Sequence, residues 1–289
     1  MITGTLLDET NPDIPSANWG PEEWTRDFAA MKADGIDTLI LNRAGFADRA
    51  TFDSAVLRRR HPRLLVQEDL VGLFLGLSEQ KDIGLWFGTY DSGECWSSGR
   101  HAEEADISRA LADEVWERYG RSRAFRGWYV AQAVDVLDAS QARACEALTR
   151  HLRQLSALPV VIAPALRATL PEAERVKAFA RLAELGDIVV LRESDVPSKD
   201  LPDRIAADAE LARAQRLTCW SEAESCEQRG ANAFPIAWPK LRSMMEAAGA
   251  AGVEKLITFE YSHFMSPHSI FSSAHMLHRR YREWLATQK

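Results

Sequence analysis

Eight short apolar segments, each followed by a polar turn and an amphipathic stretch, run through this sequence from end to end. Their apolar residues are continuous rather than alternating with polar ones, which is typical of parallel strands covered on both faces. We expect strands at residues 3–8, 37–42, 84–89, 127–132, 159–164, 188–193, 217–222 and 255–260.

The segments between these strands carry apolar residues at helical spacing. In the first of them, Trp24, Phe28 and Met31 share one face. Pro21 suits the first turn of a helix, and Gly252 suits the position just past the end of one. We expect helices at residues 21–35, 69–82, 103–119, 139–157, 172–185, 200–214, 238–251 and 274–286.

Eight strand–helix units in a row, with no long linker between them, predict an α/β fold: a single (β/α)₈ TIM barrel that forms one domain over residues 1–289. A doubly wound open sheet is the alternative arrangement of the same units. The chain has 289 residues, of which 46% are hydrophobic, so it can bury the large core that one barrel needs.

Composition excludes several partners. The net charge of −7 disfavours nucleic acid, because phosphate binding needs clustered lysine and arginine. The apolar runs are of strand length, so no membrane span is expected. No basic segment or long apolar stretch precedes the first strand, and a cytoplasmic location is expected unless a leader has been removed.

Cofactor signatures are missing as well. The four cysteines show no CxxC pair or zinc spacing, which predicts reduced thiols. The sequence contains no GxGxxG after its first strand and no GxxxxGK[ST], so nucleotide binding is not expected. We expect no cofactor and no metal ligands, and the sequence leaves the oligomeric state open.

Polar residues gather where the predicted strands end, as in the segment "ITFEYSHFMSP" at residues 257–267. In a (β/α)₈ barrel these ends form one mouth, which holds the reactive residues. A single charged residue after a strand is often only a solvated loop residue, but a carboxylate follows most of these strands. Carboxylates, arginines and aromatics converging on one concave site predict a polyhydroxylated ligand, a carbohydrate.

Tryptophan gives a second indication of sugar binding. Nine indoles are present, and Trp19, Trp96, Trp220 and Trp238 lie at or near predicted loops after strands. A flat indole ring can pack on a sugar face while its N–H reaches a hydroxyl.

Six segments, spread from the first predicted strand to the last, carry a resemblance to a known family. They are "GTLLDE", "NWGPEEWTRDFAAMKADGIDTLIL", "LWFGTYDSGECW", "FRGWYVAQAVD", "TCWSEAES" and "ITFEYSHFMSP". Together they resemble the family known as domain of unknown function 4434, described as glycoside-hydrolase-like TIM barrels. The resemblance implies a barrel that takes a carbohydrate.

Retaining glycosidases of this architecture place an acid/base carboxylate after strand 4 and a nucleophilic carboxylate after strand 7. The resemblance implies Glu224 for the second role, with Glu222 as a competitor. At strand 4 this chain departs from the family and carries Ala133 where the glutamate is expected. The replacements we consider are Glu260, Asp91 and Asp135.

We expect Glu224 and Glu260 to be the catalytic residues. We expect the substrate to be bound by residues after the strands and in the loops: Glu9, Asn42, Arg43, Tyr90, Asp91, Trp96, Gln132, Trp220, Glu222, Tyr261 and His263.

The leading hypothesis is therefore a glycoside hydrolase that acts on an oligosaccharide or glycoside. A barrel that binds carbohydrate without turnover is the alternative, because Ala133 has no proton to donate. A metal-dependent sugar isomerase or epimerase is a third hypothesis, although the sequence shows no HxH or HExxH motif and no close acidic cluster.

Overall fold

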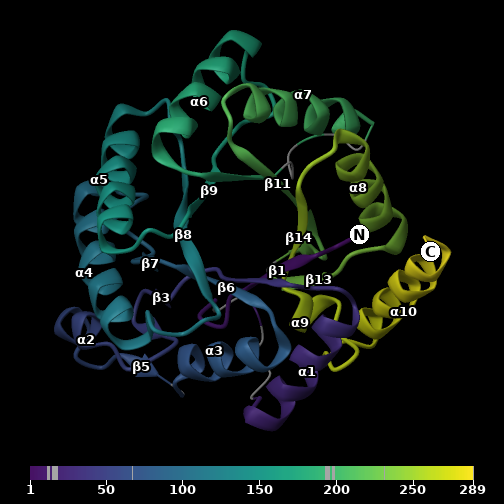
Figure 1. The fold of residues 1–289 in the computed structure, drawn as a ribbon, viewed down its shortest axis with the longest axis horizontal. Helices are drawn as coiled ribbons and strands as arrows, with labels where there is room; N and C mark the ends of the chain where they lie inside the picture. Colours follow the sequence, from purple (N-terminus) through teal and green to yellow (C-terminus); the bar gives the residue numbers. More distant parts are fainter. Residues whose placement is uncertain are drawn as a thin grey trace.

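Eight parallel strands form a closed barrel in the order β1-β14-β11-β10-β9-β8-β6-β2, with helices around it (Figure 1). The computed structural model describes residues 1–11, 14, 19–66, 68–192, 196, 199–230 and 232–288. Because the first strand pairs with the last, the sheet has no open edge. The predicted (β/α)₈ barrel is confirmed, and the doubly wound open sheet is excluded.

All eight predicted strands are present, and most ends agree with the sequence prediction within one or two residues. The strand predicted at 127–132 begins earlier and runs on to Val134. The barrel strands are β1 (Gly4–Leu7), β2 (Thr38–Leu41), β6 (Gly84–Gly88), β8 (Phe125–Val134), β9 (Val160–Pro164), β10 (Ile188–Leu191), β11 (Thr218–Glu224) and β14 (Lys255–Phe259).

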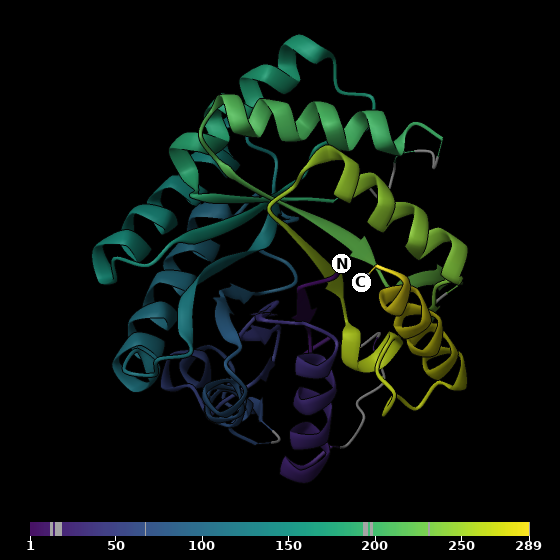
Figure 2. The same ribbon diagram turned by 45° about the vertical axis from the view of Figure 1, so that its right-hand side comes forward.

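The eight predicted helices are also present, and they surround the strands in both views (Figure 2). In the first helix Trp24, Phe28 and Met31 are buried together, as their spacing predicts, and Pro21 is its first residue. Gly252 follows α8 with a φ of 65°, a left-handed conformation that glycine adopts without strain. The helices are α1 (Pro21–Ala33), α3 (Leu70–Lys81), α4 (His101–Tyr119), α5 (Ala139–Leu155), α6 (Glu172–Leu185), α7 (Leu201–Ala214), α8 (Trp238–Ala251) and α10 (Ser272–Thr287).

Several small elements lie in the loops that follow barrel strands, and the sequence patterns do not predict them because such short strands have no readable period. A four-stranded sheet joins the loops after β2 and β6, and a hairpin follows β11. A single helical turn follows β14. These elements are β3 (Gly45–Phe46), β4 (Arg49–Ala50), β5 (Leu65–Val66), β7 (Tyr90–Asp91), α2 (Ala55–Arg60), β12 (Cys226–Arg229), β13 (Asn232–Pro235) and α9 (Tyr261–Phe264).

Two layers of apolar packing hold the barrel together. The larger lies between the strands and the helices, and the smaller fills the barrel with side chains such as Leu6, Ile40, Tyr129 and Ile257. The barrel is thus a packed core and not a pore, so its chemistry is confined to the end where the strands finish. The four cysteines form no disulfide. Among the described residues, no helix combines the length and the apolar character needed to span a bilayer.

Candidate active site at the mouth of the barrel

Arg43, which follows β2, joins two carboxylates at the mouth. Its Nη2 lies 2.7 Å from Asp8 Oδ2, and its Nη1 lies 2.7 Å from Asp91 Oδ2. Asn42 Nδ2 also donates to Asp8 Oδ2, at 2.9 Å. The guanidinium lies 4.3 Å from the centre of the Phe46 ring, which supports it from one face. Arg43 thus holds the side chains of Asp8 and Asp91 in place, and its charge is paired with theirs.

A second arginine holds a carboxylate on the opposite part of the rim. Arg192, directly after β10, donates from Nε to Glu222 Oε2 at 2.6 Å and from Nη2 to Tyr129 Oη at 3.0 Å. The Glu222 side chain is only 4% exposed. The short contact with the arginine holds the Glu222 side chain in one position at the rim.

Glu224 ends β11 and stands opposite Phe259 in the register with β14, so it lies next to the point where Glu260 leaves its strand. The electrostatics place the two glutamates in one neighbourhood. Burial, together with the charges of Glu224 and Glu260, raises the pKa of the Cys226 thiol to about 12. The predicted gathering of these two carboxylates at one end of the barrel agrees with this arrangement.

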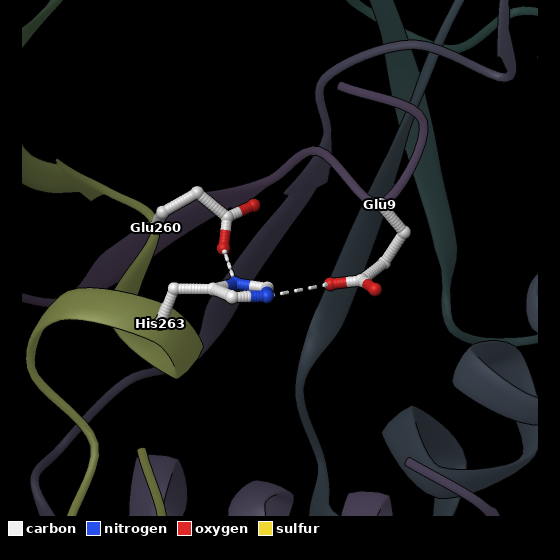
Figure 3. Close-up of side chains that lie close together, drawn as sticks. All are labelled: Glu9, Glu260 and His263. Carbon is white, nitrogen blue, oxygen red and sulfur yellow. Dashed lines mark hydrogen bonds and ion pairs between the residues drawn. The ribbon is translucent and has the colours of Figure 1, made fainter. Parts of the chain in front are cut away.

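Glu260, His263 and Glu9 form a chain of side chains from β14 to β1 (Figure 3). Glu260 is fully buried and has a φ of 57°, a left-handed conformation that is uncommon for a residue other than glycine. Its Oε1 accepts the backbone N–H of Asp8, and its Oε2 lies 2.7 Å from His263 Nδ1. The other ring nitrogen, Nε2, lies 3.7 Å from Glu9 Oε1. Both carboxylate oxygens of Glu260 are therefore occupied within the protein.

The single turn α9 fixes the histidine in this chain. Ser262 Oγ donates to the buried Asp27 on α1 at 2.7 Å, and Ser266 Oγ donates to the other oxygen of Asp27. The ring of Trp19 is stacked parallel to the His263 ring, with 6.5 Å between the ring centres. These contacts leave His263 little freedom to rotate away from Glu9.

Burial and charge set the proton affinities here. Burial raises the pKa of Glu9 to about 7; His263 opposes the rise, while Glu260, Asp8 and Asp27 add to it. Burial also raises the pKa of Glu260. For His263, burial lowers the pKa, but the charge and hydrogen bond of Glu260 outweigh burial and raise it to about 9. Near neutral pH the mouth thus holds two different groups. One is the carboxyl group of Glu9, which readily gains and loses a proton, and the other is the charged imidazole of His263.

Glu9, Glu260 and His263 each place a ligand atom within 4.8 Å of the others. These residues are far apart in the sequence or lack a metal-binding motif, but the fold brings them into one cluster. However, both oxygens of Glu260 already accept hydrogen bonds. Metal binding at His263 Nε2 would also require the ring to lose a proton, and the pKa of His263 is raised to about 9. We therefore assign no metal to this cluster, and the isomerase hypothesis gains no support from it.

The structure brings eight of the predicted site residues together at the mouth and places five away from it. The mouth holds Glu9, Asn42, Arg43, Asp91, Glu222, Glu224, Glu260 and His263. Tyr90, Trp96, Gln132, Trp220 and Tyr261 point elsewhere, for reasons specific to each.

Tyr90 belongs to the small sheet, and its buried phenol donates to the Ala47 carbonyl at 2.7 Å. Gln132 Nε2 donates to the Tyr90 carbonyl at 2.7 Å and to Glu104 of α4 at 3.1 Å, so this side chain leaves the barrel on its helical side. Tyr261 donates from its phenol to the buried Asp34 at 2.7 Å. All three side chains are hydrogen-bonded to other groups of the protein, away from the mouth.

The two tryptophans in this set also lie outside the mouth. Trp220 stands opposite Lys255, the first residue of β14, and packs inside the barrel against Trp86. Trp96 packs on the ring of His101 at the start of α4, with 4.8 Å between ring centres. Trp19, which also follows a strand, lies beside His263 at the site.

Ala133 is exposed near the end of β8, and its neighbour Gln132 turns to the helical side. By alternation along the strand, Ala133 faces the mouth without a functional group. The proposed replacement Asp135 accepts the N–H of Leu137 at 3.0 Å, and Asp91 is paired with Arg43. Glu193, the last residue of the strand predicted at 188–193, lies outside the described residues.

Sequence reasoning missed Asp27, whose carboxylate holds α9 in place. Its position gave a signal: it is three residues from Trp24 and four from Met31, and so lies on the apolar face of the first helix. Burial raises the pKa of Asp27 to about 6, against the hydrogen bonds of Ser266 and Ser262.

Comparison with solved structures gives many matches. One is described as "Crystal structure of a putative alpha-L-fucosidase from Bacteroides thetaiotaomicron VPI-5482"; it is 34% identical, with a TM-score of 0.91 over 99% of this chain and 93% of that one. An endo-β-1,4-mannanase from Thermotoga petrophila has 8% identity and a TM-score of 0.63 over 100% of this chain and 77% of that one. A β-glucuronidase from an uncultured Clostridium sp. has 10% identity and a TM-score of 0.60, with 98% of this chain matching 50% of the larger protein.

The last two similarities show a shared fold alone. No curated protein matches the sequence. The model of one family matches residues 2–271, which is nearly the whole chain. The chain therefore belongs to the family described as Domain of unknown function (DUF4434), and its fold is a glycoside-hydrolase-like TIM barrel.

Proposed function

We propose that this protein hydrolyses a glycosidic bond at the mouth of the barrel, with Glu224 and Glu9 as the two working carboxyl groups. Glycoside hydrolysis needs one carboxyl group to protonate the leaving oxygen and another to attack the sugar or activate water. The observation that carries the proposal is Glu9 itself, a buried carboxyl group at the mouth whose pKa is raised to about 7, on the same rim as Glu224 at the end of β11. A carboxyl group with a raised pKa is a feature of acid–base sites.

Glu9 supplies the proton in this scheme. Ala133 leaves β8 without an acid, and Glu9 on β1 has the protonation state that a donor needs near neutral pH. Glu224, at the end of β11, provides the second carboxylate at the strand where related barrels carry theirs. Glu260 is fully buried and its two oxygens are held by the Asp8 N–H and His263, so we assign it a positioning role in place of the catalytic role that the sequence suggests.

The substrate in this proposal is a carbohydrate. Asn42, Arg43 and Asp91 surround the buried Asp8 and present polar edges to hydroxyl groups, and Trp19 offers an aromatic ring beside His263. The relative described as a fucosidase makes α-L-fucosides the first substrates to test.

A screen of aryl glycosides, beginning with α-L-fucosides, tests the proposal. We expect turnover by the wild type and a loss of about 10²-fold to 10⁴-fold in kcat for Glu9→Gln, the range typical of a general acid. An aryl substrate with a good leaving group should show a smaller loss in Glu9→Gln, because such a group needs little protonation. Equal turnover by wild type and Glu9→Gln on every substrate would remove Glu9 from the mechanism.

A barrel that binds carbohydrate without turnover is the second candidate, favoured by the exposed Ala133 on β8. Calorimetry with a sugar that binds, followed by long incubation without product, would support this candidate. Release of reducing ends that depends on Glu224 would exclude it.

A further inference from the structure

The chain of Glu260, His263 and Glu9 is organised around the histidine, which faces a carboxylate on each side (Figure 3). Nδ1 lies 2.7 Å from Glu260 Oε2, and Nε2 lies 3.7 Å from Glu9 Oε1. A neutral imidazole has one N–H and could donate to only one of these carboxylates. A doubly protonated imidazole has two N–H groups and suits both.

In this row of three side chains, the contact between Glu260 and His263 is fixed. The Glu260 backbone adopts the left-handed conformation, and its two side-chain oxygens take the Asp8 N–H and His263 Nδ1. A non-glycine residue persists in such a conformation only where its surroundings enforce it. Glu260 is therefore built to hold the ring, which α9 carries and which lies parallel to the ring of Trp19.

The contact between His263 and Glu9, by contrast, is not closed by a hydrogen bond. Glu9 Oε1 and His263 Nε2 are both buried, and neither has a hydrogen-bond partner among the described residues. Two buried polar atoms aimed at each other across 3.7 Å are too far apart for a hydrogen bond. A small movement of the Glu9 side chain would close the gap and satisfy both atoms.

The charges that face Glu9 are otherwise acidic. Glu260, Asp8 and Asp27 raise its pKa, and His263 is the group that lowers it. Asp8 is paired with Arg43, and Asp27 accepts hydrogen bonds from the two serines of the α9 region. Among the described residues, His263 is thus the cation placed to stabilise a negative charge on Glu9.

We propose that His263 is a positioning residue, kept doubly protonated between Glu260 and Glu9, that orients Glu9 and stabilises its carboxylate after it gives up a proton. The role in catalysis rests on the proposed function, whereas the state of the ring can be tested without it. When Glu9 transfers its proton to the leaving oxygen, the new carboxylate accepts a hydrogen bond from Nε2. His263 keeps both of its protons, so the proton that Glu9 later regains comes from the attacking water.

Nitrogen-15 NMR of the histidine rings tests the state of His263 in the full chain, purified with a chelator. We expect both ring nitrogens to stay protonated up to about pH 9. Glu260→Gln should lower the titration midpoint of His263 by about one pH unit or more, and Glu9→Gln should lower it in the same direction, because each removes a nearby negative charge. Asp113→Asn removes a carboxylate from His151 and is the matched control that should leave the His263 signals unchanged.

A midpoint near 6.5 for His263 in the wild type would overturn the proposal, and this result needs no variant to fold. A bare Nε2 whose signal changes on adding zinc would also overturn it, because a metal ion would then occupy the gap. These outcomes do not depend on turnover, so they separate failure of this inference from failure of the proposed function.

The pH profile of an active preparation tests the catalytic part. His263→Asn removes the cation beside Glu9, so the pKa of Glu9 should rise and the basic limb of kcat should move to higher pH by about one unit. A lower kcat with an unshifted limb would show that His263 is only structural.

Discussion

Arg192 donates to Glu222 at 2.6 Å across the ends of β10 and β11. This ion pair distinguishes Glu222 from Glu224, the two glutamates that the sequence leaves as competitors for one role. Glu222 is nearly buried and committed to the arginine. Glu224, two residues later at the end of the same strand, is the carboxylate that we assign to the reaction.

Glu224→Gln should lower kcat by at least about 10²-fold, because an amide can neither attack a sugar nor accept a proton from water. Glu246→Gln is the matched control, since Glu246 is an exposed residue of α8 paired with Arg242. Its kcat should equal that of the wild type. Steady-state kinetics on the first glycoside found to be turned over would decide, and an active Glu224→Gln protein would refute the assignment.

Arg175 and Asp208 form an ion pair between α6 and α7, with side chains 2% and 0% exposed. Arg175→Met leaves a buried carboxylate without its cation and should lower the free energy of unfolding by about 3–5 kcal/mol. Urea denaturation at pH 7 measures this change.

The control for that experiment is Arg150→Met, which breaks an exposed pair with Glu146 on α5. Exposed pairs contribute about 0–1 kcal/mol, so the control should lie close to the wild type. Equal losses in the two variants would contradict the importance of burial.

Asp27 should make stability depend on pH. Its pKa rises from its ordinary 3.8 to about 6 on folding, so the native state binds this proton more tightly than the unfolded chain. The stability that protonated Asp27 contributes is fully present below about pH 4 and is lost as the pH rises through 6. The loss is about 3 kcal/mol for a shift of this size.

Asp27→Asn removes this titration. The unfolding free energy of the wild type relative to Asp27→Asn, measured by urea denaturation, should therefore fall between pH 4 and pH 7. A difference that stays constant over this range would show that Asp27 keeps its ordinary pKa.

Gly88 ends β6 at a point where backbones approach closely. A Cβ there would lie 2.2 Å from the Leu41 carbonyl oxygen and 2.4 Å from that of Asn42. Backbone atoms of neighbouring strands cannot move aside cheaply, so Gly88→Ala should destabilise the protein by about 3 kcal/mol.

Gly249→Ala is the control of identical chemistry, because a Cβ at this position in α8 meets no atom of another described residue within 4 Å outside the backbone of its own helix. Alanine favours a helix interior, so this variant should gain roughly 0.5–1 kcal/mol. Thermal unfolding of the two variants should shift in opposite directions. Shifts of the same sign would contradict the close approach at Gly88.

The apolar runs of the sequence predict the barrel well, because each strand is buried on both faces and each helix has one apolar face. They also place Glu9, Arg43, Glu222 and Glu224 at the correct end, since parallel strands finish together. Strand ends alone do not reveal the direction of a side chain.

Gln132 and Tyr90 show the limit of such reasoning. Gln132 alternates to the helical side, and Tyr90 belongs to a two-residue strand that has no period to read. The orientation of Glu260 depends on a left-handed backbone that its sequence neighbours do not signal, because a glycine is the usual marker of that conformation. The chain from Glu260 to Glu9 could therefore be seen only in three dimensions.

The pairing of β1 with β14 has a consequence for synthesis on the ribosome. Glu9 is made first, and the partners that tune it follow strand β14, more than 240 residues later. In a nascent chain halted before Lys255, Glu9 would lack both Glu260 and His263. Competence for the proposed chemistry would thus arise only after β14 and α9 have been synthesised, so that chains halted before them stay inert.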